Sequence, residues 1–218
     1  MDPESIWIIG YGKFGRRAAD LLNNSGRARP QVTVVDSKQP DQVTGGIDYI
    51  KADGVRWFVD NFHQTSRVDR IIPALPVHLA AEWVKERLVA ENRTVQQFPI
   101  PEKILPLLPN PYKISADTYA LSYATFLCPP DCEEPEECCT VTGQSRPEPL
   151  YELVNSISLE NVVILSIQSR QFAPGAGGFY AGDLWQLLDT VQKHEPAHFL
   201  LVTACKCHGI ITGLSVRK

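Results

Sequence analysis

The sequence has no cysteine before Cys128, no long apolar run and no excess of positive charge. Its 218 residues carry 21 Lys and Arg against 25 Asp and Glu, a formal net charge of −4. Proteins that neutralise nucleic-acid phosphates need a basic surface, so we expect no nucleic-acid partner. Apolar stretches such as residues 198–204 are far shorter than the roughly 20 residues of a membrane-spanning helix, so we expect no membrane span.

The first residues also lack the features of a signal peptide. Acidic side chains, Asp2 and Glu4, stand where a signal peptide carries positive charge. The composition, 44% hydrophobic and 21% charged, is that of an ordinary globular protein. We therefore expect a cytoplasmic protein with one large domain or two small ones.

The first half of the sequence alternates strand-like and helix-like segments. The predicted strands are residues 5–9, 32–35, 48–51 and 69–72, and the predicted helices are residues 14–22, 55–62 and 77–90. Strands that alternate with helices are typical of a parallel sheet with right-handed crossovers. For residues 1–94 we predict an α/β domain with a Rossmann-like, doubly wound parallel sheet.

A glycine motif, Gly10-x-Gly12-x-x-Gly15, follows the first predicted strand directly. In this context the first glycine permits a tight turn, the second lets a pyrophosphate approach, and the third lets the helix pack closely. Asp36 ends the next predicted strand, where a carboxylate binds the adenosine ribose and repels a 2′-phosphate. We predict an NAD(H) site; its residues are Gly10, Tyr11, Gly12, Lys13, Phe14, Gly15, Asp36 and Ser37. The alternatives are another adenine nucleotide, or glycines that only form the turn.

Two interpretations are open for each of three further residues, Arg16, Arg17 and His78. Arg16 and Arg17 follow the glycines and could contact phosphate, although solvated helix charges are the commoner case. His78 follows the fourth predicted strand and could face the nicotinamide. A histidine near a helix start more often makes a local hydrogen bond.

The segments IIGYGKFG and VTVVD, with the strands and helices around them, resemble the Trk-type NAD-binding (TrkA-N) domain of potassium-uptake regulators. The resemblance covers residues 4–93, with Gly10, Gly12, Gly15 and Asp36 as the matching positions. It implies a cytosolic domain that binds NAD(H) or another adenine nucleotide, forms a homodimer, and reports ligand state to a protein partner such as a membrane transporter.

The second half has less regular patterning. Residues 98–112 contain five prolines, which predicts a linker or an irregular crossover. Residues 169–178 are rich in glycine and predict a flexible connector, with a second anion-binding loop as the alternative. Predicted strands at 159–168, 197–203 and 209–216 and a helix at 182–193 complete the chain. For residues 95–218 we predict a smaller α/β or α+β domain, rich in cysteine.

All six cysteines lie in this second half: Cys128, Cys132, Cys138, Cys139, Cys205 and Cys207. In a reducing compartment, clustered thiols indicate metal or redox chemistry more than disulfides. We predict a zinc site or an iron–sulfur cluster, with reduced inert thiols or disulfides as alternatives. The preferred ligands are Cys128, Cys132, Cys139 and Cys207, with Cys138 and Cys205 as substitutes. Continued extended geometry would direct Cys205 and Cys207 to one face.

Three functions remain open from the sequence. The favoured one is an NAD(H)-binding regulatory or sensor protein with a cysteine-ligated metal centre, because no recognisable catalytic group lies near the glycine motif. The second is an NAD(H)-dependent oxidoreductase that passes electrons between nicotinamide and an iron–sulfur centre or thiols. The third is an interaction module in which zinc only stabilises the fold.

Overall fold

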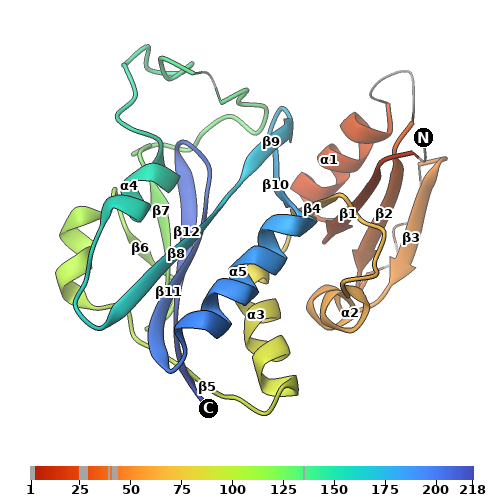
Figure 1. Cartoon of the computed structure of the whole chain (residues 1–218). Coiled ribbons are helices and arrows are strands. Elements are labelled where there is room, and N and C mark those ends of the chain that lie inside the picture. The colour runs from red at the N-terminus through yellow and green to blue at the C-terminus, as the bar shows by residue number, and fades with distance from the viewer. Residues whose placement is uncertain (1–2, 25–28, 39, 41–43, 135) are drawn as a thin grey trace.

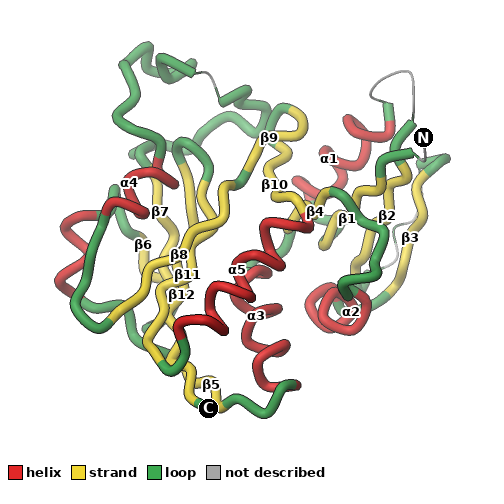
Figure 2. Tube along the Cα trace, viewed as in Figure 1, coloured by secondary structure: helices red, strands yellow, loops and turns green. Residues whose placement is uncertain are grey.

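The computed structural model describes residues 3–24, 29–38, 40, 44–134 and 136–218. Within these residues the chain forms two mixed β-sheets, with helices between and around them (Figures 1 and 2). None of the helices in this part of the chain combines the length and apolar character needed to cross a membrane.

The first sheet, sheet A, has the strand order β3-β2-β1-β4-β10-β9. Its strands are β1 (Ser5–Ile9), β2 (Gln31–Asp36), β3 (Ile47–Lys51), β4 (Arg70–Pro73), β9 (Arg170–Ala173) and β10 (Ala176–Tyr180). The first four strands are mutually parallel, as the alternating pattern predicts. β10 pairs antiparallel with β4 and β9 antiparallel with β10, so the sheet is mixed.

The prediction of an all-parallel sheet is therefore wrong at one edge. The segment 169–178, predicted to be a flexible connector, instead contains β9, the β9–β10 turn and the start of β10. A Cβ atom on Gly178 would lie 2.3 Å from the Ile71 carbonyl oxygen. Glycine at this position lets β10 approach β4 closely enough to pair, which sequence periodicity alone does not reveal.

Helices cover both faces of sheet A. Helix α1 (Lys13–Asn23) packs its Ala18 and Leu22 against Ile6 and Ile8 on one face. Helices α2 (Gly54–Asn61) and α3 (Leu79–Ala90) pack against the other face. This covering explains why β1 is apolar after Ser5 and why the four central residues of β2, Val32 to Val35, are buried on both faces.

The second sheet, sheet B, has the order β6-β7-β12-β11-β8, and β5 also pairs with β12. Its strands are β5 (Thr94–Gln97), β6 (Tyr112–Lys113), β7 (Thr118–Ser122), β8 (Val162–Gln168), β11 (Ala197–Ala204) and β12 (His208–Arg217). Only the β8–β11 pair is parallel. Three further helices belong to this half: η1, a 3₁₀ helix (Glu102–Leu107), α4 (Leu150–Ser156) and α5 (Ala181–His194).

Both sheets share one hydrophobic core. Helices α3 and α5 lie between the sheets (Figure 1). The largest cluster joins Ile71 of sheet A, Trp83 of α3, Leu184 of α5 and Phe199 of sheet B. β8 of sheet B continues through Ser169 into β9 of sheet A. Residues on either side of Thr94 thus contribute to the same packing.

The proline-rich segment 98–112 is not a bare linker. It contains the 3₁₀ helix η1, and Ile100, Ile104 and Leu108 are buried in a core of their own with Leu121. A 3₁₀ turn accommodates proline where an α-helix would lose hydrogen bonds, which is why the proline count was misleading.

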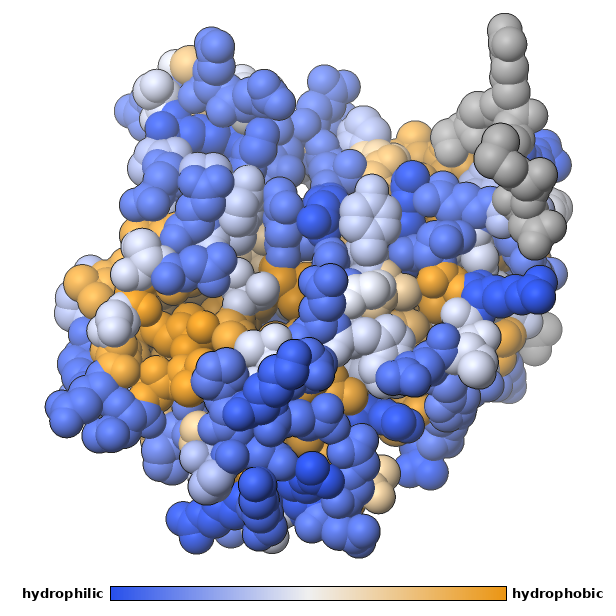
Figure 3. Space-filling model, viewed as in Figure 1, coloured by the Kyte–Doolittle hydropathy of each residue, from blue (hydrophilic) through white to orange (hydrophobic). Residues whose placement is uncertain are grey.

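Strand β8 lies at the edge of sheet B, and its apolar side chains are only half buried. On the face drawn in Figure 3, hydrophobic residues gather over the region of β8 and α4. The loop between β7 and α4, which carries four of the cysteines, is hydrophilic in the same view.

Candidate functional site

The glycine loop joins β1 to α1, and its three glycines meet different constraints. Gly10 has a φ of +106°, and a Cβ there would lie 2.5 Å from the Ala74 carbonyl oxygen. A Cβ on Gly15 would lie only 2.0 Å from the Gly10 carbonyl oxygen. The predicted tight turn at Gly10 and close packing at Gly15 are confirmed. A Cβ on Gly12 would meet no atom within 4 Å, so the backbone there faces open space.

Asp36 at the end of β2 faces the glycine loop. Its Oδ2 accepts a hydrogen bond from the Tyr11 backbone N–H at 2.6 Å, and its Oδ1 accepts one from the Lys38 backbone N–H at 2.8 Å. An ionised carboxylate has about four lone-pair sites, so both oxygens can still accept from a ligand hydroxyl. Tyr49 packs edge-on against Tyr11, and burial raises its pKa, as does the charge of Asp36.

The other predicted cofactor residues lie on the surface near this carboxylate. Lys13 and Phe14 begin α1 with exposed side chains, and Ser37 lies in an exposed bend after β2. Arg16 Nε donates to the Tyr11 carbonyl oxygen at 3.2 Å, and Arg17 Nε donates to the Pro174 carbonyl oxygen at 3.2 Å. The structure therefore gives both arginines a protein partner.

A cavity of about 570 Å³ lies at the carboxyl ends of β1 and β4. Its walls are the glycine loop from Gly12 to Phe14, the β4–α3 connection from Ile72 to Pro76, and the start of β10 from Gly175 to Gly177. In open α/β sheets, ligands bind at the carboxyl ends of the strands where successive connections leave in opposite directions. We call this the glycine-loop cavity.

His78 does not face the glycine-loop cavity. It is buried before α3, and its ring nitrogens lie 2.9 Å from the hydroxyls of Thr203 and Thr212 in sheet B. Burial lowers its pKa to about 3, so the ring is neutral. The ring therefore forms hydrogen bonds, but they are not the local ones that the sequence favoured, because both partners lie in β11 and β12, more than 120 residues away in the sequence.

Four cysteines lie in the irregular segment between β7 and α4, and two lie in the β11–β12 hairpin turn. Extended geometry does not continue past Ala204, because the Cys205 backbone N–H donates to the His208 carbonyl oxygen at 2.8 Å and closes the turn. The expectation that Cys205 and Cys207 extend the strand is therefore wrong. The turn also brings His208, the first residue of β12, toward the long loop.

A second cavity, of about 490 Å³, lies between this hairpin turn and the long loop. Four of the six predicted cysteines line it: Cys128, Cys132, Cys205 and Cys207. Glu134, Arg146 and His208 line it as well. We call this the cysteine cavity. Neither Cys138, which is exposed, nor Cys139, which is half-buried and was among the preferred ligands, lines it.

Two of the sulfurs accept hydrogen bonds from the backbone that follows them. Cys205 Sγ accepts the N–H groups of Cys207 at 3.4 Å and of His208 at 3.3 Å. Cys139 Sγ is hydrogen-bonded by the backbone of Thr142 and Val141 and by the Thr142 side chain, which lowers its pKa. N–H groups aimed at sulfur favour a thiolate, the form that binds metals.

Burial acts on Cys205 in the opposite direction. Burial first, and then the nearby Glu134 carboxylate, raise the pKa of this thiol to about 12 despite the two N–H groups. The thiol is therefore protonated at neutral pH. Formation of a thiolate here would need a bound cation to offset its burial and the charge of the carboxylate.

Cys128 Sγ lies 3.4 Å from His208 Nε2. Two ligands of a tetrahedral zinc ion, at the usual Zn–S and Zn–N lengths, are separated by about 3.5 Å. His208 is not among the ligands that the sequence favours. Within the described residues, however, no group of three or more His, Cys, Asp or Glu side chains is arranged as a metal site.

The two cavities meet at the turn between β9 and β10. Phe14, Gly175 and Gly177 line both. A Cβ on Gly175, whose φ is +74°, would lie 1.8 Å from the Pro130 carbonyl oxygen. The long loop between β7 and α4, which we call the cysteine loop, therefore packs directly against this turn. No spacing in the sequence indicates this contact, because the two segments are more than forty residues apart.

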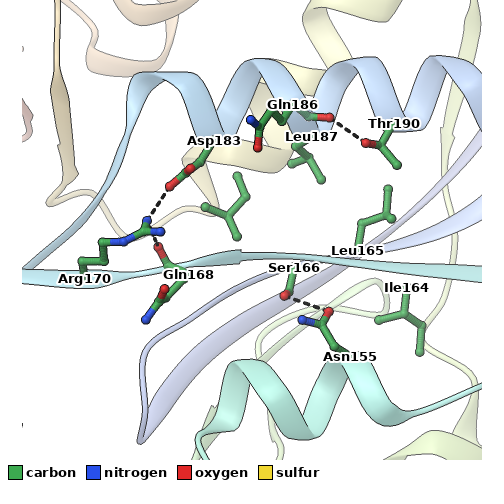
Figure 4. Close-up of a pocket in the computed structure, with 11 residues that line it drawn as sticks. Asn155, Ile164, Leu165, Ser166, Gln168, Arg170, Asp183, Gln186, Leu187 and Thr190 are labelled. Carbon is green, nitrogen blue, oxygen red and sulfur yellow. Dashed lines mark hydrogen bonds and ion pairs between the residues drawn. The ribbon is translucent and has the colours of Figure 1, made fainter.

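A third, polar groove runs along the outer side of β8 between α4 and α5 (Figure 4). Its polar side chains are paired: Arg170 with Asp183, Ser166 with Asn155 at 2.9 Å, and Thr190 with the Gln186 carbonyl oxygen at 2.7 Å. Arg170 also lines the cysteine cavity. Because these groups already have partners, the groove is a weaker candidate than the two cavities.

Comparison with known proteins defines the family but no activity. The chain belongs to a family described as "Uncharacterized protein, C-terminal domain", whose model matches residues 80–217, more than half of the chain. A protein of Archaeoglobus fulgidus, described as "Uncharacterized protein", is 28% identical over 222 residues, covering 95% of this chain and 97% of the relative. No solved structure matches. The family region begins within α3 and includes every cysteine and both strands of the β9–β10 hairpin.

Proposed function

We propose that this protein binds NAD(H) in the glycine-loop cavity, carries a cysteine-ligated metal centre in the cysteine cavity, and acts as a cytoplasmic regulatory or sensor protein. The observation that carries the proposal is the open backbone at Gly12, which borders a cavity and has Asp36 beside it. A loop that only had to turn would not need this space.

The strand order supports a Rossmann-like dinucleotide site. The parallel order β3-β2-β1-β4, with helices on both faces, matches the first half of the dinucleotide-binding fold and the first strand of its second half. The N–H groups at the start of α1 have no side-chain cap, so they are available to a phosphate. Asp36 would bind the ribose hydroxyls and disfavour the additional phosphate of NADP(H).

The donor set supports a soft metal ion. Cys128 and His208 are already at a ligand-to-ligand distance, and the Cys139 and Cys205 sulfurs accept backbone N–H groups. Cys132 and Cys207 line the cysteine cavity with Cys128, Cys205 and His208, whereas Cys139 lies outside its lining. Zinc and an iron–sulfur cluster both accept such thiolates, and only the cluster would supply electron transfer.

The regulatory role follows from the resemblance to the TrkA-N domain and from the lack of a recognisable catalytic group in the glycine-loop cavity. The described residues that line this cavity are glycine, proline, alanine and larger aliphatic or aromatic residues, and Lys13 is the charged residue among them. A sensor would report dinucleotide binding to a transporter or another protein, as a homodimer.

Calorimetric titration tests the dinucleotide site. Wild-type protein should bind NADH more tightly than NADPH or ATP, and Asp36→Ala should weaken NADH binding while reducing the preference over NADPH. Asp48→Ala, which removes an exposed carboxylate from the neighbouring strand β3, is the matched control. Unchanged NADH affinity in Asp36→Ala would refute the assignment of the glycine loop.

Metal analysis of anaerobically purified protein tests the second site. Stoichiometric zinc in a colourless protein supports the sensor or an interaction module in which zinc stabilises the fold. A brown protein with the broad visible absorption of an iron–sulfur cluster supports a redox role. Protein without metal after purification and reconstitution contradicts the proposed centre.

A second function, an NAD(H)-dependent oxidoreductase, is favoured by the shared wall of the two cavities at Phe14, Gly175 and Gly177. This wall lies on the β4 side of the glycine loop, where the nicotinamide half of a dinucleotide would extend. Oxidation of NADH by ferricyanide, compared in wild type and Cys128→Ser, distinguishes the two functions. Turnover that depends on Cys128 supports the oxidoreductase, and binding without turnover supports the sensor.

A further inference from the structure

Arg146 carries an uncompensated buried charge in the cysteine cavity. Its Nε and Nη1 atoms are buried, and neither has a hydrogen-bond partner within the described residues. A guanidinium that loses its hydration without gaining acceptors is costly, and arginine suits the recognition of carboxylate and phosphate groups. The expected partner of Arg146 is therefore a negatively charged group that occupies the cavity.

Among the residues that the structure describes, no carboxylate forms an ion pair with Arg146. Glu134, the acidic residue that lines the same cavity, accepts the Lys206 backbone N–H at 2.6 Å and makes no ion pair with Arg146 within the described residues. The groups whose ionisation responds to the charge of Arg146 are Cys128, Cys139, Cys207 and His208. Arg146 also lines the cavity together with Cys128, Cys207 and His208.

The cavity is large for a metal ion alone. Its volume of about 490 Å³ lies in the range of sites for small organic molecules, roughly 300–1,000 Å³. Part of its wall is apolar and comes from Phe14, Phe126 and Leu127. A ligand that matches this lining has an apolar body and one anionic end.

We propose that the cysteine cavity binds a small organic anion, whose carboxylate or phosphate pairs with Arg146 and whose apolar body contacts Phe14 and Phe126. This site requires neither NAD(H) in the glycine-loop cavity nor a metal on the cysteines. Because Phe14, Gly175 and Gly177 line both cavities, a dinucleotide and this second ligand would lie next to each other.

Three probes test the site: benzoate, phenyl phosphate, and benzamide as the neutral analogue of benzoate. Each is titrated calorimetrically into wild-type protein, Arg146→Gln and Arg56→Gln. The control, Arg56, is an exposed arginine of α2 that pairs with Asp60, far from either cavity's lining. Urea unfolding and NADH titration of each variant establish that it is folded and that the glycine-loop cavity is intact.

We expect benzoate or phenyl phosphate to bind wild type and Arg56→Gln, and benzamide to bind more weakly. Loss of a charge-assisted hydrogen bond should weaken the anion about tenfold or more in Arg146→Gln. Arg146→Lys, which keeps the charge, should restore part of the affinity. The stronger of the two anions identifies the carboxylate or the phosphate as the group recognised.

Two results would overturn the proposal. One is that neither anion binds wild type at millimolar concentration, or that both bind Arg146→Gln equally well. The other is binding that appears only after a chelator has stripped the protein of metal, because a thiolate–metal centre would then be the true partner of Arg146. NADH binding that fails in wild type while the anion binds would refute the dinucleotide proposal alone.

Discussion

The two loops that border the cavities are built in different ways. The glycine loop lies between a buried strand and a helix, and neighbouring backbone atoms leave no room for a side chain at Gly10 or Gly15. The cysteine loop between β7 and α4 contains no strand or helix in the described residues, and its side chains are mostly exposed or half-buried.

The two loops therefore keep their conformations through different kinds of contact. The glycine loop derives its shape from packing, so a ligand there would add little to the stability of the fold. The cysteine loop is held by contacts of Pro130 with Gly175, of the Cys132 carbonyl oxygen with Gln171 at 2.5 Å, and of Glu134 with Lys206. A loop with so few buried apolar contacts would be stabilised more strongly by a bound ligand.

The largest expected effect is at Gly15, where a methyl group has no room. Gly15→Ala should lower the free energy of unfolding by about 3 kcal/mol, because the new Cβ would overlap the Gly10 carbonyl oxygen. Gly12→Ala, whose Cβ meets open space, should cost within about 1 kcal/mol at this helix N-cap yet weaken NADH binding.

Urea unfolding and NADH titration of the two variants measure this contrast. If Gly12→Ala bound NADH as wild type does, the open space would have no role in binding. Equal stability losses in both variants would remove the distinction between a packing glycine and a ligand-facing one.

The second effect concerns the cysteine loop. Zinc at 100 times its dissociation constant should raise the free energy of unfolding by about 2.7 kcal/mol, provided that it binds only the folded state. Urea unfolding with and without zinc measures the gain, and Cys139→Ser should reduce it, because the sulfur that the Thr142 backbone orients is then absent. A gain of the same size in Cys139→Ser would exclude this thiol as a ligand.

The sequence predicts what depends on local spacing. The strand Ser5–Ile9 has the predicted bounds, and the glycine turn and the α5 helix follow from periodicity and from the residues at their ends. The β9–β10 edge of sheet A was missed because it depends on Gly178 meeting Ile71, a contact between segments far apart in the chain. Arg146 was missed for the same reason: it lies in an irregular loop, and only tertiary structure shows its lack of a partner.

The third prediction concerns His78, which joins the start of α3 to sheet B. His78 has a pKa of about 3 in the folded protein and about 6.5 when unfolded, so the unfolded state binds the additional proton between these values. Stability from this group is therefore complete above about pH 6.5 and falls as the pH decreases toward 3. Between pH 7 and 5 the loss should be about 2 kcal/mol.

Comparison of wild type with His78→Gln isolates this contribution. Both proteins lose stability as carboxylates protonate, but the wild type should show the additional loss, measured by urea unfolding at each pH. Identical pH profiles would mean that the ring is not held neutral between Thr203 and Thr212.

The smallest expected effect separates two adjacent cysteines. Neither thiol lines the cysteine cavity, but Cys138 is exposed and lies in an isolated backbone bridge with Ser145, whereas the Cys139 sulfur is hydrogen-bonded by Val141 and Thr142. Cys138→Ser should change the free energy of unfolding by no more than about 0.5 kcal/mol and leave the zinc-dependent gain intact. Adjacent residues direct their side chains apart, so one metal ion is expected to bind Cys139 and not its neighbour. Should Cys138→Ser abolish the gain while Cys139→Ser preserves it, the backbone N–H groups at Cys139 would have no part in metal binding, and the loop would have to rearrange when it binds zinc.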